Sequence, residues 1–198
     1  MKLFFIAVTL LLLGGCSTMT PPKSEYRLKS DMPSKILNQT GCANKSLKVA
    51  EAFSSSTLMA LDMNYVQGTN KQFAYAQAQW STSPNHAITD KLLSLIRDAN
   101  LFKSVQVSKS RSKNDLILET NIEDFMQYYS EDFRESYSNV VITLTLIDSN
   151  TNSVLSTKTF SSKVVAKRLD SEGGVVALDS ALYDVLSQIN EWFSKVCK

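Results

Sequence analysis

The stretch Val140-Val141-Ile142-Thr143-Leu144-Thr145-Leu146 decides the fold class of this 198-residue chain. Val140, Ile142, Leu144 and Leu146 occupy every second position, and threonine fills two of the three positions between them. Side chains of a β-strand point alternately to opposite faces. The spacing therefore predicts a strand with one face in a hydrophobic core and the other face in water.

Two further strands are expected next to this one in the sequence. Leu116, Leu118 and Ile122 share one face of the strand that precedes it, and a third strand covers about residues 154–165. Residues 148–152 form a polar turn between the second and third strands. These two strands are therefore expected to pair as an antiparallel hairpin.

Two amphipathic helices accompany the strands. Ser83 and Pro84 are a suitable N-cap and first-turn pair for a helix that ends near Asn100. The second helix is expected to begin near Val175, after a loop at residues 169–174. Its apolar residues follow spacings of three and four positions: Leu178, Leu182, Val185, Ile189, Trp192 and Val196. Because only about three heptads are present, the helix is expected to lie on a sheet rather than in a coiled coil.

The first half of the chain adds short strands, at residues 26–28 and 47–50. Residues 61–65 and 73–77 are expected to form a hairpin around Gly68-Thr69-Asn70. Strands and two amphipathic helices together predict an α+β fold. We expect a mainly antiparallel sheet with both helices packed on one face.

Composition excludes several classes of function. The 21 basic side chains face 19 acidic ones without a dominant basic patch, which argues against nucleic-acid binding. The only histidine is His86, so a histidine-rich metal site is excluded, and no cofactor-binding motif is present. Glu123 and Asp124 are adjacent in a strand and point to opposite faces, so they cannot form a paired-carboxylate site by themselves. No catalytic set of residues emerges.

The N-terminus has the features of an export signal. A basic start, an apolar run at residues 3–13 and Gly14-Gly15-Cys16 are typical of a secretory signal peptide. The run is shorter than the roughly 20 residues that span a bilayer. Leu13-Gly14-Gly15-Cys16 resembles the lipobox of bacterial lipoproteins, which implies cleavage before Cys16 and lipidation of its thiol. The alternative is an ordinary signal peptide with an unrelated cysteine. The expected organisation is a signal peptide at 1–15, a lipidated tether at 16–24 and one domain at 25–198.

Two cysteines remain beside Cys16. Cys42 and Cys197 are an even pair in an oxidising compartment, which suggests a disulfide between them. Two free buried thiols are the alternative.

Residues 125–137 carry five aromatic side chains among acidic ones. Either the strands at 116–128 and 134–147 are long and these rings cover the sheet, or the segment is a projecting tip. In the second case Tyr128, Tyr129 and Phe133 would dock a partner, because aromatic residues favour interfaces.

Several of these features, taken in order, resemble the family of ABC-type transport auxiliary lipoproteins. After the lipobox come Tyr26-Arg27-Leu28, a hairpin with Tyr65, Phe73, Tyr75 and Trp80, a helix from Pro84 through Ile96, Leu101-Phe102-Lys103-Ser104-Val105, and a closing helix that ends near Trp192-Phe193. The chain departs from the family in having Phe53-Ser54-Ser55 where a proline is usual and Gln79 where an arginine is frequent. Cys42 and Cys197 also lie outside the family pattern.

The resemblance implies a non-catalytic role in an MCE-type lipid transport system, with the protein held by its lipid on the periplasmic face of the outer membrane. It implies a homo-oligomeric ring that docks the tunnel of an MCE-domain protein. The candidate interface residues are Tyr65, Phe73, Tyr75, Trp80, Tyr128, Tyr129 and Phe133. Two alternatives stay open: a structural or assembly lipoprotein of another outer-membrane complex, and a periplasmic enzyme that uses His86 and a serine such as Ser83.

Overall fold

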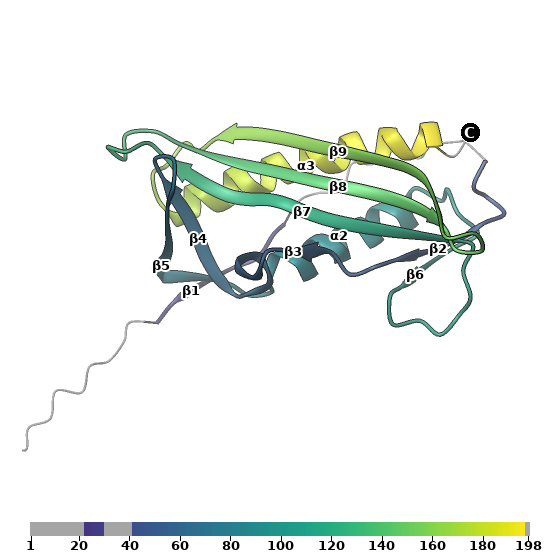
Figure 1. Ribbon diagram of the computed structural model, residues 1–198. Helices are drawn as coiled ribbons and strands as arrows, with labels where there is room; N and C mark the ends of the chain where they lie inside the picture. The colour runs from purple at the N-terminus through teal and green to yellow at the C-terminus, as the bar shows by residue number, and fades with distance from the viewer. Residues whose placement is uncertain (1–21, 30–40, 197–198) are drawn as a thin grey trace, which may run out of the picture.

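The computed structural model describes residues 22–29 and 41–196, which form one mixed sheet of nine strands with two helices on one of its faces (Figure 1). The elements in chain order are β1 Ser24–Tyr26, β2 Ser46–Val49, β3 Phe53–Ser54, the 3-10 helix η1 Ser56–Met59, β4 Asp62–Gln67, β5 Lys71–Trp80, α2 Pro84–Asp98, β6 Ser104–Val107, β7 Leu116–Tyr129, β8 Ser136–Asp148, β9 Ser153–Val165 and α3 Ser171–Val196.

Strand β7 organises the sheet. It has 14 residues, and along one edge it pairs with β8, which in turn pairs with β9. Its other edge has room for three short strands placed one after another. β2 lies beside residues 116–118, β3 beside 121–122 and β4 beside 127–129. β6 extends the sheet beyond β2, and β5 followed by β1 extends it beyond β4.

The expectation of a mainly antiparallel sheet was wrong. Five of the eight strand pairings within the described residues are parallel, and the sheet is mixed. The antiparallel pairs are β4–β5, β7–β8 and β8–β9, each of which joins neighbours in the sequence through a short turn. The parallel pairs join segments far apart in the chain, so no local turn signals them. The broader α+β class is correct.

Helix α3 begins at Ser171, so the last four residues of the loop expected at 169–174 are helical instead. Asp170 explains the earlier start. The Gly173 N–H donates to Asp170 Oδ1 (2.8 Å), and the Gly174 N–H donates to the Asp170 carbonyl oxygen (3.0 Å). An aspartate that accepts from the third helical residue is a favoured N-cap.

The core lies between the sheet and the helices. The four apolar residues that predicted β8 are all buried, and Leu178, Leu182, Val185 and Ile189 bury the facing side of α3. Helix α2 contributes Ile88, Leu92, Leu95 and Ile96. Each such side chain stabilises the fold by about 1.5–3 kcal/mol when it is fully buried.

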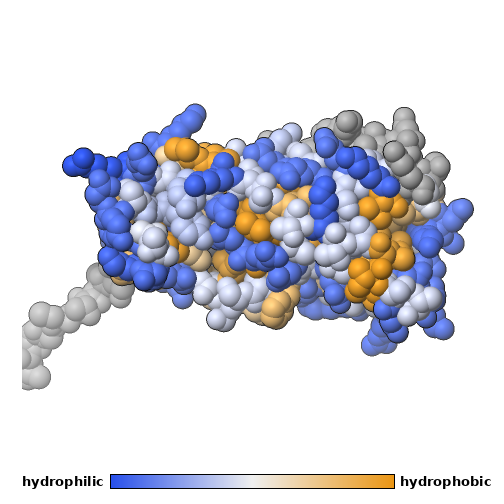
Figure 2. Space-filling model, turned by 45° about the horizontal axis from the view of Figure 1, so that its top comes forward, coloured by the Kyte–Doolittle hydropathy of each residue, from blue (hydrophilic) through white to orange (hydrophobic). Residues whose placement is uncertain are grey.

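The opposite face of the sheet is not covered by these helices (Figure 1). Its strands carry hydroxyl pairs: the Thr143 and Thr159 oxygens lie 2.6 Å apart, and the Thr157 hydroxyl donates to Thr145 Oγ1 (3.3 Å). Figure 2 shows a largely hydrophilic surface on this side, interrupted by separate hydrophobic patches. Among the described residues, no helix has the length and apolar character needed to cross a membrane.

Candidate interaction site

Five aromatic rings meet at the end of the sheet where β4, β5 and the β7–β8 turn come together. This aromatic cluster consists of Tyr65, Phe73, Tyr75, Tyr129 and Phe133. Tyr65 lies at its centre, with ring centroids 4.6 Å from Tyr75, 5.4 Å from Tyr129, 5.6 Å from Phe73 and 6.5 Å from Phe133. Two groups of aromatic residues that lie apart in the sequence therefore form one surface feature.

Strand register brings these rings together. Tyr65 lies opposite Phe73 in the antiparallel β4–β5 pair, and beside Gln127 in the parallel β4–β7 pair. Phe133 lies in the turn between β7 and β8 with φ of 55°, an uncommon conformation for a large side chain. This turn places the Phe133 ring 5.2 Å from that of Tyr129.

The rings differ in exposure, which separates structural residues from accessible ones. Phe73 and Phe133 are each 43% exposed, whereas Tyr129 is buried and Tyr65 and Tyr75 are half-buried. Exposed aromatic side chains supported by buried ones are well placed to contact a partner, because little side-chain entropy remains to be lost.

Two of the candidate interface residues lie outside the aromatic cluster. Trp80 is buried in the core, where its ring lies 5.9 Å from that of Phe125. Tyr128 lies on the opposite face of the sheet from Tyr129, because neighbours in a strand alternate. There it stacks on Tyr137 at 5.1 Å with an interplanar angle of 8°.

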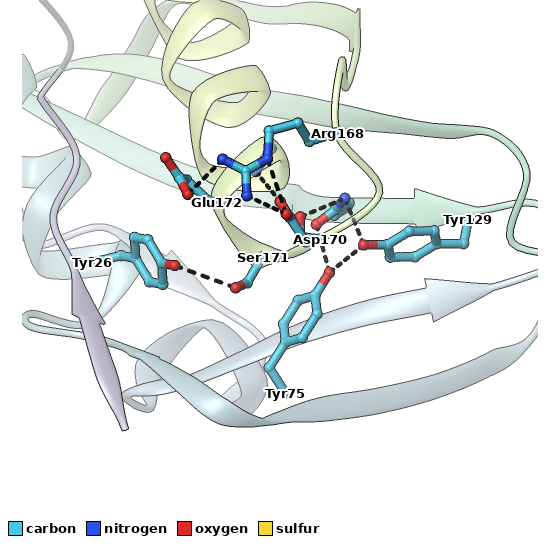
Figure 3. A network of polar contacts seen from close by, with 9 residues as sticks. Tyr26, Tyr75, Tyr129, Arg168, Asp170, Ser171 and Glu172 are labelled. Carbon is cyan, nitrogen blue, oxygen red and sulfur yellow. Dashed lines mark hydrogen bonds and ion pairs between the residues drawn. The ribbon is translucent and has the colours of Figure 1, made fainter. Parts of the chain in front are cut away.

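Beneath the aromatic cluster lies a closed ring of hydrogen bonds around the fully buried Gln127 (Figure 3). The Tyr75 hydroxyl donates to Gln127 Oε1 (2.7 Å), and Gln127 Nε2 donates to the Tyr129 hydroxyl (3.0 Å). The two tyrosine hydroxyls are 2.7 Å apart, which closes the ring. Gln127 Nε2 also donates to Ser136 Oγ (2.8 Å), so both amide protons are used.

This ring needs both phenols in their protonated form. Burial is the main cause that raises the pKa of Tyr75, and the hydrogen bond with Tyr129 raises it further. Burial also raises the pKa of Tyr129 above its ordinary value of 10.0. Both hydroxyls therefore remain donors throughout the pH range in which proteins are usually folded.

The first turn of α3 packs directly on this network. A Cβ added at Gly174 would overlap Gln127 Oε1, so only glycine permits this approach. Arg168 holds the preceding loop by donating to Asp170 Oδ2 (2.7 Å) and Glu172 Oε2 (2.8 Å). The Tyr26 and Ser171 hydroxyls, 3.4 Å apart, join β1 to the same helix end (Figure 3). The sequence pattern did not predict this network. Gly173 and Gly174 at the start of a helix are a pattern that can indicate close packing there.

Asp124 lies beside Tyr128, on the face of the sheet opposite the aromatic cluster, and its charge state leads to a testable prediction. Its carboxylate accepts from the Tyr128 hydroxyl (2.7 Å) and Asn139 Nδ2 (2.8 Å), yet burial raises its pKa above the ordinary 3.8. Folding thus favours the protonated form, and stability falls as pH rises through the folded-state pKa. We expect Asp124→Asn to raise the free energy of unfolding at pH 7 and to have little effect at pH 3. Urea denaturation at both pH values measures this, and a destabilised variant at pH 7 would contradict it.

The sequence model for the ABC-type transport auxiliary lipoprotein component matches residues 26–190. The chain belongs to this family. The resemblance drawn from the sequence motifs is thereby confirmed. No curated protein sequence matches this auxiliary lipoprotein.

Solved structures share the fold of this auxiliary lipoprotein. A protein from Xanthomonas campestris superposes with a TM-score of 0.78 at 15% identity, covering 87% of this chain and 95% of that chain. An uncharacterized protein gives a TM-score of 0.62 at 14% identity, covering 86% of this chain and 98% of that chain. The family assigns this auxiliary lipoprotein to ABC-type transport and to the cell envelope.

The remaining candidates occupy separate places in the auxiliary lipoprotein. His86 Nδ1 pairs with Glu51 Oε1, whereas the buried Ser83 hydroxyl donates to Asn85 Oδ1 (2.7 Å), so each of the two side chains has a different partner. Cys42 is buried and disulfide-bonded; Cys16 and Cys197 lie outside the described residues, so pairing with Cys197 stays a prediction. The described residues contain no group of three His, Cys, Asp or Glu side chains that could hold a metal ion.

Proposed function

We propose that this auxiliary lipoprotein is a non-catalytic component of an MCE-type ABC lipid transport system. In this proposal it forms a homo-oligomeric ring on the periplasmic face of the outer membrane and docks the tunnel of an MCE-domain protein. Family membership supports the transport role, and the lipobox supports anchoring through Cys16. The tether at 16–24 then joins the lipid to the domain at 25–198.

The aromatic cluster carries the docking part of the proposal. The rings of Phe73 and Phe133 are exposed, and both pack against the ring of Tyr65. The half-buried and buried tyrosines hold these rings from below, so the surface is pre-organised. Interfaces concentrate their binding energy in such supported aromatic side chains.

We expect the double variant Phe73→Ala and Phe133→Ala to weaken the ring or its capture of the MCE-domain protein. Truncation of an interface aromatic side chain typically costs about 2 kcal/mol or more. A ring repeats that loss at each junction. Light scattering measures the oligomer, and co-purification measures capture of the MCE-domain protein.

The matched control is Phe53→Ala, which removes an exposed phenylalanine on β3. Circular dichroism of both variants reports whether the fold persists. A wild-type protein that stays monomeric and does not bind the MCE-domain protein would overturn the ring-and-tunnel proposal. It would favour the structural or assembly role in another outer-membrane complex.

A further inference from the structure

The loop between β6 and β7 carries a positive charge at every second position. We call residues 108–113, with the sequence Ser-Lys-Ser-Arg-Ser-Lys, the basic loop. Lys109, Arg111 and Lys113 are all exposed. Figure 1 shows the loop projecting from the end of the sheet where β7 begins. Three cations therefore extend from one end of the domain.

The serines between these cations hold the basic loop in a fixed shape. Lys48 Nζ donates to the carbonyl oxygens of Ser110 and Ser112, 3.2 Å away in each case. The hydroxyls of the same two serines donate to Gln106 Oε1. Lys48 and Gln106 are register partners in the β2–β6 pair, so both supports belong to the sheet. The serines are therefore fixed on the sheet, and the cations beside them are left in solvent.

This arrangement gathers like charges without an ion pair to offset them. Within residues 22–29 and 41–196, none of Lys109, Arg111 and Lys113 forms an ion pair, and Lys48 adds a fourth cation beneath them. The next carboxylate along the chain, Asp115, accepts from the N–H and the hydroxyl of the first residue of β2 instead (2.7 Å each). Like charges repel, so holding them together costs free energy that a loose loop would relax. A surface that keeps them together is suited to an anionic partner.

Two carboxylates do lie near one of the three exposed cations. Lys109 lines the groove between α2 and the end of β6 together with Glu51 and Asp90. Arg111 and Lys113 do not line this groove. These two cations are therefore the part of the basic loop that is most available to a partner.

The direction of β1 places the basic loop away from the proposed lipid anchor. β1 is parallel to β5, and β5 begins beside the aromatic cluster, where Phe73 lies. The described chain therefore enters β1 from that end of the sheet, whereas the basic loop lies at the opposite end (Figure 1). An anchor at Cys16 would hold the aromatic end nearest the membrane and the basic loop farther from it. This position argues against anionic lipid as the partner of the loop.

We propose that the basic loop docks an acidic surface of the MCE-domain protein. This inference rests on the proposed function and adds to it the docking surface and the chemistry of the partner. The cations follow one another along an exposed loop, an arrangement that matches several carboxylates on a protein better than one small anion. Arg111 is suited to this contact, because a guanidinium group can bind a carboxylate through two hydrogen bonds.

The test measures binding of the MCE-domain protein to the full lipidated chain at low and high salt. Arg111→Gln combined with Lys113→Gln should lower the affinity at low salt about tenfold, because charge complementarity accelerates association. At about 1 M NaCl this variant and the wild type should bind alike, since the screening length falls to roughly 3 Å. Lys167→Gln combined with Lys195→Gln is the matched control. It removes the same charge from exposed positions after β9 and near the end of α3, and should bind as the wild type does.

The outcomes separate this inference from the proposed function. Equal binding by the loop variant and the wild type would overturn the role of the loop and leave the proposed function intact. A wild-type chain that does not bind the MCE-domain protein at low salt would contradict the proposed function and this inference together. Displacement of the MCE-domain protein by phosphatidylglycerol vesicles, but not by phosphatidylcholine vesicles at the same ionic strength, would assign the loop to anionic lipid. Loss of the ring in the loop variant, measured by light scattering, would assign it to a contact between copies of the chain. Either of these last two results also overturns the proposal.

Discussion

Gly173→Ala is expected to lower the free energy of unfolding by about 2–3 kcal/mol, the cost of forcing atoms into a filled space. A Cβ at this position would overlap the Arg168 carbonyl oxygen and lie 2.8 Å from the Arg168 carbonyl carbon and Cβ. These are backbone-fixed atoms, and the Arg168 side chain is tied to Asp170 and Glu172. The expected sign is unusual, because alanine ordinarily stabilises a helix interior relative to glycine by about 1 kcal/mol.

Ser180→Ala is the control for this substitution. Ser180 is exposed on the same helix, and its replacement should change the free energy of unfolding by less than about 0.5 kcal/mol. Urea denaturation with circular dichroism compares the two variants. If Gly173→Ala were as stable as the wild type, the close approach of the β9–α3 loop to the helix would be contradicted.

Gln127→Ala is expected to have an effect of about 3 kcal/mol or more, since it combines a cavity with lost hydrogen bonds. The fully buried side-chain amide of Gln127 is hydrogen-bonded to Tyr75, Tyr129 and Ser136. Its removal takes away the Oε1 acceptor of the Tyr75 hydroxyl and the Nε2 donor to the Tyr129 and Ser136 hydroxyls. The loss should appear as a lower midpoint of urea denaturation.

Two variants show which part of the loss comes from hydrogen bonding. Gln127→Met fills most of the space without donating or accepting in the same way, so its stability should fall between those of wild type and Gln127→Ala. Gln72→Ala, at an exposed position on β5, should be close to wild type. Equal effects of Gln127→Ala and Gln72→Ala would refute the structural role of the ring. In a double-mutant cycle with Tyr75→Phe, the two losses should be less than additive.

Local patterns predicted the elements of the fold better than their arrangement. The alternation at Val140–Leu146 and the polar turn at 148–152 identified β8, β9 and their antiparallel pairing, because strand and turn signals are local. The parallel strands β2, β3 and β4 all pair with β7, and nothing near them in the sequence specifies that partner. The length of β7 decides the arrangement. From the sequence, a long strand was only one of two interpretations of residues 125–137, the other being a projecting tip.

The candidate site shows the same division. Tyr65, Phe73 and Tyr75 were expected to line one hairpin, and Tyr129 and Phe133 to lie on another tip. Only the parallel β4–β7 register brings these groups into contact. The burial of Gln127 was not predicted, because a polar residue in a strand is usually exposed. Its burial depends on Gly174, which lies on a helix that the sequence alone does not place against β7.

The parallel strands on β7 also have a consequence for the order of folding. The Ser46 N–H donates to Asp115 Oδ2, 69 residues further along the chain, so β2 can pair with β7 only after about half of the domain has been synthesised. Strands β7, β8 and β9, in contrast, form two long antiparallel pairs between neighbours in the sequence. Loop-closure entropy favours such short-range contacts early in folding. The C-terminal half is therefore expected to act as the folding nucleus, and β2 and β3 must stay unpaired from β7 until it has formed.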